Sequence, residues 1–467
     1  MTTSGPPHVA LLATPGMGHL IPLVELARRV ASRHGATATL LTFASTASAT
    51  QRAVLASLPP TVSHRPLPPV DLSDLPRGAA IETLMHEECA RSLPALEDIL
   101  ADLRRTTRLV AFVTDMFGVD SLDAARDAGV ERRCLFMTVS LHSVSLILHL
   151  PELVLSVPGE FRDLEEPVRL PGCVPIPGAD IISPLQDRSS PAYGSIVHIA
   201  ARFRKNEADA LLVNSFDAVE PDAAAVLRQT TPGRPPVFPI GPLILTAAKT
   251  SGANGTTPHQ PRAACLEWLD RQPARSVIFV SFGSGGALPA EQMRELALGL
   301  ELSGQRFLWV VRSPSDEGSL SENYYDAASK KDPFAYLPEG FVERTKDVGL
   351  VVPSWAPQTE VLGHDATGGF LTHCGWNSTL ESLVHGVPMV AWPLFAEQRM
   401  NAVMLAEGVG AAIRLPEVKD REAIAVAVRE LMVMAGEGKG AVVRAKVVEL
   451  QKARQRDSVK VVPRQWH

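Results

Sequence analysis

Residues 355–398, WAPQTEVLGHDATGGFLTHCGWNSTLESLVHGVPMVAWPLFAEQ, contain the pattern that decides the fold of this chain. At their centre, residues 368–372 form a short apolar run that predicts a buried strand, and the polar residues 377–379 favour a helix start. We therefore expect a strand, a tight turn at Gly375 and then a helix. Such a helix start presents unpaired backbone N–H groups and the positive end of its dipole, which suit a pyrophosphate.

Polar side chains surround this predicted turn in an order that suits a nucleotide sugar. His373, Asn377 and Ser378 would contact phosphate oxygens, and Glu381, one helical turn past Asn377, would accept hydrogen bonds from two ribose hydroxyls. A buried strand and a capped helix with an incidental histidine is the alternative interpretation. The number of polar residues in this order favours the binding site.

The start of the stretch offers a place for the base. Trp355 supplies a flat face for a pyrimidine, and Gln358 carries both a donor and an acceptor for its edge.

A second informative region lies near the start of the chain, where residues 8–27 predict an apolar strand, a glycine turn and an amphipathic helix. The turn carries His19 in a Gly-x-Gly-His sequence, at the carboxyl edge of a parallel sheet where ligands bind. The third glycine of the dinucleotide fingerprint is missing from this motif, which argues against NAD.

Residues 109–115 form another buried-strand pattern, and it ends in Asp115. A carboxylate bonded to one ring nitrogen of His19 would fix the tautomer and stabilise the cation formed when the other nitrogen takes a proton. The alternative for Asp115 is a helix N-cap for the segment that follows. Asp120 and Asp123, further along, have the pattern of solvated helix positions.

Apolar runs alternate with helical patterns along the whole chain, which predicts two α/β halves with parallel sheets facing each other across a cleft. An exposed linker is expected at 246–264, and the polar insertion at 313–333 receives no assignment. The predicted strands lie near 8–14, 37–43, 109–115, 133–138, 210–214, 276–284, 306–312, 350–354, 368–372 and 387–392, and a helix is predicted near 290–303.

From about residue 19 to 440 the chain resembles the plant family 1 UDP-glycosyltransferases with the secondary-product signature. Within that family the phrases LPGCVPIPG (170–178), VSFGSGG (280–286), RFLWVVRSPS (306–315) and FLTHCGWNSTLES (370–382) are most similar to the phenol-glucosylating hydroquinone glucosyltransferase, or arbutin synthase, group. The resemblance implies the GT-B fold, with an acceptor-binding Rossmann-like domain at 1–245 and a UDP-sugar-binding one at 265–440.

The resemblance also implies a donor-binding set. Glu397 departs from the Asp that is usual in the family but keeps the carboxylate, and Gln398 is associated with glucose as the transferred sugar. The predicted donor set is Thr138, Ser284, Trp355, Ala356, Gln358, His373, Gly375, Trp376, Asn377, Ser378, Glu381, Glu397 and Gln398.

By the same resemblance His19 and Asp115 form the catalytic dyad of an inverting transfer from UDP-glucose to a small phenol, giving a β-glucoside. His19, Met116, Phe117 and Ala396 are expected to contact the acceptor, beside an apolar helix around Val144, Leu146 and Leu148. Because the chain contains no Asp-x-Asp pair, we expect no metal and no cofactor besides the UDP-glucose co-substrate. A UDP-sugar-binding protein without transferase activity, an epimerase or phosphorylase, and transfer of another sugar or to another lipophilic acceptor remain alternatives.

Composition agrees with an ordinary globular protein. The chain has 467 residues, 45% hydrophobic and 21% charged, and a formal net charge of −6 gives no reason to expect nucleic acid. Five scattered cysteines without a Cys-x-x-Cys pair indicate neither a disulfide framework nor a zinc site, and Cys374 is expected to be a packing residue.

The sequence also gives expectations about location and the tail. The N-terminus has no signal-peptide pattern, and the apolar stretch 139–157, with polar interruptions and a break at Pro151, predicts a buried helix rather than a membrane span. We expect a cytoplasmic monomer. Residues 441–467 are expected to form a partly helical tail whose end departs from the family pattern and lowers thermal stability.

Overall fold

The computed structural model describes residues 5–44, 49–76, 78–204, 208–245, 263–314, 332–433 and 438–460. The described residues form two compact units. The first covers residues up to Ser215 and Pro221–Leu245, and the second covers Phe216–Glu220 and the described residues from Ala263 onward. Most of the predicted linker at 246–264 and of the polar insertion at 313–333 lies outside the described residues, as do residues 461–467.

The first unit is built on a seven-stranded parallel sheet in the order β3-β2-β1-β4-β5-β6-β7. Its central strands are runs of buried apolar residues because helices cover both faces of such a sheet. The strands are β1 (Pro7–Leu12), β2 (Thr37–Phe43), β3 (Val62–Leu67), β4 (Arg108–Asp115), β5 (Arg132–Met137), β6 (Ala210–Val213) and β7 (Val237–Pro239).

The helices of the first unit start and end at residues suited to those positions. Gly35, in the left-handed conformation with φ 61°, ends α1, and Ser140 caps the start of α6 by accepting from the backbone N–H of Ser143. The helices are α1 (Met17–His34), α2 (Ala49–Ala56), α3 (Ile81–Arg91), α4 (Leu93–Thr106), η2 (Met116–Gly118), α5 (Ser121–Asp127), α6 (Leu141–Ser156), η3 (Phe161–Asp163), η4 (Gly178–Asp180), η5 (Ser183–Leu185), α7 (Pro191–Arg204) and α8 (Pro221–Leu227).

The second unit contains a six-stranded parallel sheet in the order β10-β9-β8-β11-β12-β13. Its strands β8 and β11 are buried along their whole length. The strands are β8 (Val277–Ser281), β9 (Arg306–Val311), β10 (Gly349–Pro353), β11 (Thr367–Thr372), β12 (Met389–Ala391) and β13 (Ala412–Arg414).

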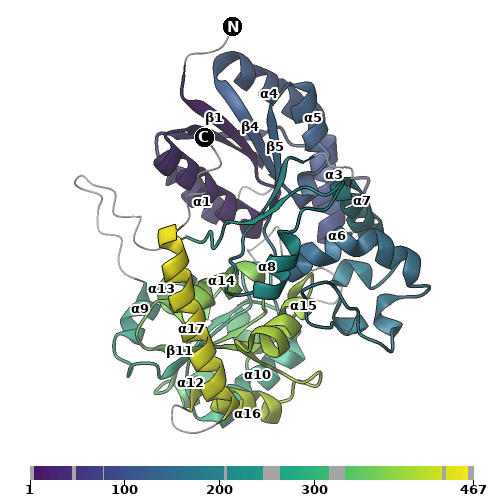
Figure 1. Cartoon of the computed structure of the whole chain (residues 1–467). Coiled ribbons are helices and arrows are strands. Elements are labelled where there is room, and N and C mark those ends of the chain that lie inside the picture. The colour runs from purple at the N-terminus through teal and green to yellow at the C-terminus, as the bar shows by residue number, and fades with distance from the viewer. Residues whose placement is uncertain are drawn as a thin grey trace. The chain divides into compact units, whose positions relative to one another are not determined.

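Helices surround this second sheet, and the long α17 packs across α14 and α16 (Figure 1). Val443, Val447 and Leu450 bury one side of α17, and Gln451 donates from Nε2 to the carbonyl oxygen of Val384 at 3.1 Å. The helices are α9 (Ala264–Leu269), α10 (Ala290–Ser303), η7 (Pro333–Tyr336), α12 (Phe341–Thr345), α13 (Gln358–Leu362), α14 (Trp376–His385), α15 (Gln398–Val403), the π-helical η8 (Met404–Val409), α16 (Arg421–Met432) and α17 (Lys439–Lys460).

Both sheets reverse their winding direction at one place. In the first unit β1 and β4 are neighbours at this switch point, and in the second unit β8 and β11 are neighbours. The carboxyl ends of strands at a switch point form the crevice in which open α/β sheets bind ligands. The prediction of two Rossmann-like parallel-sheet halves is confirmed, and each sheet has one such switch point.

The structure corrects two local expectations. Pro151 does not break its helix, because α6 continues through it to Ser156. Most of the helix before Pro151 is buried, so it is the predicted buried helix. Strands β3, β7 and β13 were not predicted, since β3 has four exposed residues in a row and the other two have three residues each.

Candidate functional site

At the switch point of the first unit, His19 and Asp115 lie within hydrogen-bonding distance. His19 is in the first turn of α1, after the Gly16 turn that follows β1, and Asp115 is the last residue of β4. His19 Nδ1 lies 3.1 Å from Asp115 Oδ2, and the two side chains are 14% and 0% exposed. With Nδ1 facing a carboxylate, the proton of the neutral ring belongs on Nδ1, which leaves Nε2 as the basic nitrogen.

Asp115 is held by several hydrogen-bond donors. It is both the partner of His19 and a helix N-cap, the two roles that the sequence left open. Its Oδ1 accepts from the backbone N–H of Phe117 at 3.0 Å and caps η2, while its Oδ2 faces His19. Oδ2 also accepts from the backbone N–H of Thr14 at 3.2 Å and from the Thr14 hydroxyl in a short contact. These bonds compensate the burial of the carboxylate and fix its orientation. Thr14 was missed from the sequence, although it stands at the end of the same strand pattern.

Two further predicted residues lie next to the His19 ring. Thr138 Oγ1 lies 3.4 Å from His19 Nδ1, and the Phe117 ring meets the imidazole edge-on with a centroid distance of 5.6 Å. Met116 and Phe117 are both buried in η2. In contrast, the expected acceptor-lining residues of α6 belong to the core, since Val144, Leu146 and Leu148 are each at most 1% exposed.

At the switch point of the second unit, His373 follows β11 and is buried between two glycines. A Cβ atom at Gly283 would lie 2.6 Å from His373 Cε1, and a Cβ at Gly375 would lie 2.4 Å from His373 Nε2. No side chain other than glycine fits at either place without moving the ring. Nδ1 of His373 is shielded from solvent and has no hydrogen-bond partner within the described residues. Burial lowers the pKa of His373 to about 4, so the ring is neutral near pH 7.

The turn after β11 differs in one detail from the prediction. The left-handed residue is Cys374, with φ 64°, while Gly375 is extended and precedes the first residue of α14. Gly375 is therefore required for the close approach to His373 and not for its dihedral angles. Burial raises the pKa of the Cys374 thiol to about 12, which keeps it protonated and fits the packing role expected for it.

Left-handed backbone at non-glycine residues is concentrated around the predicted donor residues. Ser354, Cys374 and Ala396 have φ values of 65°, 64° and 54°, and they directly precede Trp355, Gly375 and Glu397. Such conformations cost free energy and persist where the surrounding contacts impose them, often at ligand sites. One of these contacts is from Asn401, which donates from Nδ2 to the carbonyl oxygen of Cys374 at 3.0 Å.

Three of the predicted donor residues contact one another directly. Gln358 donates from Nε2 to Ser378 Oγ at 2.8 Å and to Glu381 Oε2 at 2.7 Å. Burial raises the pKa of Glu381 to about 7, and the bonds from Gln358 and Thr359 oppose this rise. Asn377 lies in the same first turn of α14.

Other predicted donor residues of the second unit lie at the start of α14, around the start of α15 and in the segment before α13. Gln398 accepts through Oε1 from the backbone N–H groups of Leu394 (2.9 Å) and Phe395 (3.1 Å), which shapes the loop before α15. Glu397 Oε1 lies 3.4 Å from Asn401 Nδ2. Trp355 is 62% exposed and offers a free ring face, whereas Ala356 and Trp376 are buried.

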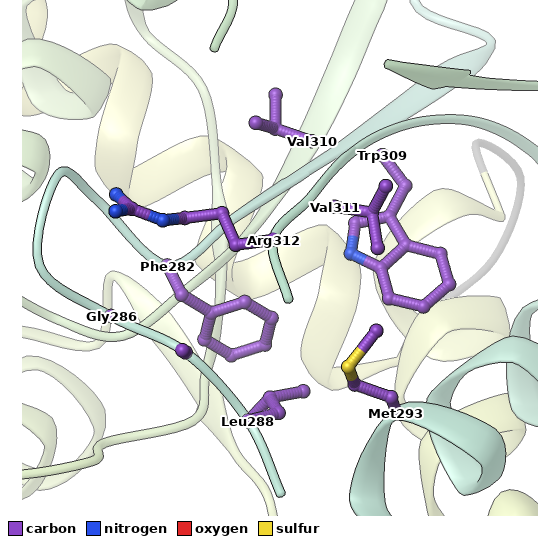
Figure 2. Close-up of a pocket in the computed structure, with 9 residues that line it drawn as sticks. Phe282, Gly286, Leu288, Met293, Trp309, Val310, Val311 and Arg312 are labelled. Atoms are coloured by element: carbon purple, nitrogen blue, oxygen red, sulfur yellow. The ribbon is translucent and has the colours of Figure 1, made fainter. Parts of the chain in front are cut away.

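Ser284 is on the exposed turn after β8, and Arg312 holds this turn in place. The Arg312 guanidinium donates to the carbonyl oxygen of Ser284 in a short contact and lies 3.4 Å from that of Gly283. Arg312 extends from the end of β9 beside a small pocket lined by apolar side chains that include Phe282 and Trp309 (Figure 2). Arg312 was not predicted as a site residue, although it lies within the phrase RFLWVVRSPS (306–315), which carries the family resemblance.

The two switch points define a class of protein: an α/β enzyme with a histidine–carboxylate pair at the edge of one sheet and a buried, neutral histidine before a helix start at the edge of the other. Residues 235–437 match the family model described as UDP-glucoronosyl and UDP-glucosyl transferase. UDP-glycosyltransferase 72B3 of Arabidopsis thaliana is 47% identical over 97% of this chain and 92% of its own length. Hydroquinone glucosyltransferase of Rauvolfia serpentina is 49% identical over 87% of this chain and 84% of its own.

A solved structure supports the same family assignment. The structure of Phytolacca americana UGT2 complexed with UDP-2fluoro-glucose and pterostilbene is similar with a TM-score of 0.85 and 43% identity, covering 97% of this chain and 96% of that one. The chain belongs to the plant UDP-glycosyltransferase family. The predicted resemblance, the GT-B fold class and the prediction of an enzyme that uses a UDP-sugar are confirmed. Within the described part of the chain, no helix has the length and apolar character needed to cross a membrane.

Proposed function

We propose that this enzyme transfers glucose from UDP-glucose to the hydroxyl of a small phenolic acceptor, with inversion, to give a β-D-glucoside. The observation that carries the proposal is the contact between His19 Nδ1 and the buried Asp115. Binding a nucleotide sugar needs no base, whereas a histidine paired with a carboxylate at a ligand-binding sheet edge is suited to taking a proton. The similarity to a hydroquinone glucosyltransferase supports the phenolic acceptor.

His19 is the general base of the proposed step. The acceptor hydroxyl gives its proton to Nε2 of His19 while the acceptor oxygen forms a bond to the anomeric carbon of glucose. The bond from that carbon to the diphosphate oxygen breaks, and its electron pair leaves with UDP. Asp115 stabilises the imidazolium formed, and Thr14 keeps Asp115 oriented. General-base help of this kind contributes about 10²–10⁴-fold to the rate.

The donor is assigned to the second unit. The backbone N–H groups at the start of α14 donate to the diphosphate oxygens, and His373, Asn377, Ser378 and Ser284 add further contacts to the diphosphate. Glu381 accepts from the ribose hydroxyls, and Trp355 stacks on uracil. Both protons of the Gln358 amide are engaged by Ser378 and Glu381, so its carbonyl oxygen is the atom assigned to the base edge.

Glu397 and Gln398 are assigned to the glucose hydroxyls. The carbonyl oxygen of Gln398 is already used by the loop, which directs its role to the amide nitrogen. Thr138 is assigned to the donor, and Met116 and Phe117 of the first unit and Ala396 of the second are assigned to the acceptor. No metal has a role in this proposal, because the neutral His373 and the helix start supply the diphosphate with donors.

The full chain incubated with UDP-glucose and a panel of simple phenols tests the proposal. We expect UDP and β-glucoside in equal amounts, unchanged by EDTA, and a loss of about 10²–10⁴-fold in kcat for Asp115→Asn. UDP binding without either product would identify a binding protein. UDP release without glucoside would identify a hydrolase, and loss of turnover in EDTA would refute the metal-free assignment.

The choice of sugar has its own test. Gln398→His is expected to lower the preference for UDP-glucose over UDP-galactose, measured as the ratio of their kcat/KM values. An unchanged ratio would remove Gln398 from the sugar assignment while leaving the transfer reaction intact.

A further inference from the structure

Away from the two switch points, two histidines and a carboxylate converge from three elements of the first unit. His86 is on α3, Asp120 precedes α5 and His198 is on α7. Their potential ligand atoms all lie within 4.8 Å of one another, and this is the one such group of three within the described residues. His198 Nε2 is 3.0 Å from both carboxylate oxygens of Asp120, and the two imidazole centroids are 5.3 Å apart. Asp120 is therefore not the solvated helix position expected from the sequence.

One ring nitrogen in this cluster lacks a partner. Nδ1 of His86 is shielded from solvent and makes no hydrogen bond to the described residues. Leaving such a nitrogen unsatisfied costs free energy, which a ligand would recover.

The residue types and their spacing suit a transition-metal ion. Two imidazoles and one carboxylate are a common ligand set for Zn²⁺ and similar ions, with metal–ligand distances of about 2.0–2.2 Å. Ligand atoms of a tetrahedral site then lie about 3.3–3.5 Å apart. The His198–Asp120 pair, at 3.0 Å, is slightly closer than this, and the widest pair, within 4.8 Å, closes by little more than about 1 Å through side-chain rotation.

Neighbouring charges determine how tightly this cluster is expected to bind a metal ion. Arg202 Nε is 3.3 Å from Asp120 Oδ1, and its guanidinium also pairs with Asp123 at 2.7 Å. This cation competes with a metal for the Asp120 carboxylate and lowers the affinity, so binding in the micromolar range is expected and not the tight binding of a structural zinc site.

We propose that His86, Asp120 and His198 form a binding site for a divalent transition-metal ion of the Zn²⁺ type, with water completing its coordination. The ion would join α3, α5 and α7. Because α3 also packs against η2, which carries Met116 and Phe117, binding would stiffen the support of that segment. This site is separate from the catalytic assignment and does not depend on the proposed function.

The test is titration of the chelator-treated full chain with Zn²⁺ by calorimetry and with Co²⁺ by visible absorption. We expect one saturable site with the absorption of a nitrogen-ligated Co²⁺ ion, and a Zn²⁺-dependent rise in Tm. His198→Ala should weaken binding at least about tenfold, which corresponds to about 1.4 kcal/mol. The side chain of His198 is 46% exposed, so this change is compatible with folding. Asp120→Asn, which keeps the side-chain size, should have a similar effect.

His364→Ala is the matched control. His364 Nε2 pairs with Asp270 Oδ1 at 3.1 Å, but no third ligand joins this pair within the described residues. The control should bind Zn²⁺ as the parent does. The proposal would be overturned if all variants, including the control, bound Zn²⁺ equally weakly. It would also be overturned if His198→Ala and Asp120→Asn left Zn²⁺ binding unchanged, or if the parent showed no saturable binding below millimolar Zn²⁺.

Discussion

The switch points of the two units place a histidine in different surroundings. In the first unit the turn after β1 supplies His19, and the neighbouring strand β4 supplies Asp115 as its partner. In the second unit, β8 and β11 occupy the positions that β1 and β4 have in the first. His373 follows β11, and the turn after β8 places Gly283, rather than a carboxylate, next to its ring. What faces the imidazole across the switch point therefore decides its chemistry.

The surroundings of each ring explain the difference. Beside His19, the buried Asp115 carboxylate faces Nδ1, which leaves Nε2 as the nitrogen that can take a proton. His373, enclosed by backbone and glycines, has only the cost of burial, which holds its pKa near 4 and keeps it a neutral donor. A neutral donor is suited to a diphosphate that arrives with its own charge, because no proton has to be moved to bind it.

Replacing each histidine by alanine tests the comparison most strongly. His19→Ala should lower kcat by about 10²–10⁴-fold with UDP binding nearly unchanged. His373→Ala should mainly raise the KM for UDP-glucose, by about tenfold for one lost hydrogen bond to a charged group. Steady-state kinetics with UDP binding by calorimetry separates the two. If both variants lost only kcat, the division of roles would be wrong.

Adding one methyl group beside His373 tests whether the glycine contact matters. Gly283→Ala places a Cβ 2.6 Å from the ring and should weaken UDP binding by about tenfold, or about 1.4 kcal/mol. Gly304→Ala is the matched control, because Gly304 has a similar φ of 66° but no atom within 4 Å of the added Cβ. Both changes should cost about 1–2 kcal/mol of stability through left-handed strain. Equal UDP affinity in the two variants would show that the close contact between Gly283 and His373 is unimportant for UDP binding.

Glu381 gives the most specific effect, because it acts through pH. Its folded-state pKa of about 7 lies above the ordinary 4.5, so the stability linked to its protonation is present below pH 4.5 and is lost as pH rises toward 7. The maximum change is about 3 kcal/mol. Glu381→Gln should therefore gain stability over the parent between pH 5 and 8, measured by urea unfolding at each pH.

Binding should show the opposite trend, because the ribose hydroxyls prefer the carboxylate. UDP-glucose affinity of the parent should rise from pH 6 to pH 8, and Glu381→Gln should lose this dependence. His373 opposes this stability trend. Because its pKa is lowered from 6.5 to about 4, its contribution to the stability of the fold falls as pH drops from 6.5 to 4. Glu381→Gln must therefore be compared with the parent at each pH.

Much of both sheets was predictable, including the edge strand β10, but the edge strands β3, β7 and β13 were not. Apolar runs identified β8, β9 and β11, because strands buried on both faces carry uninterrupted hydrophobic residues. The first sheet's edge strand β3, VSHRPL, has no such run and forms through pairing with β2. A local pattern cannot show such pairing. Pro151 was misjudged for a related reason, since the packing of α6 outweighs its local preference.

Sequence by itself determined the two-sheet α/β architecture and the residue types at both switch points, because hydrophobic periodicity and turn chemistry are local properties of the chain. Tertiary structure alone decided which groups meet. It paired Thr14 with Asp115, set Gly283 against His373, and brought His86, Asp120 and His198 together. Burial and contact between residues far apart in sequence set charge state and hydrogen bonding, and these depend on the packed fold.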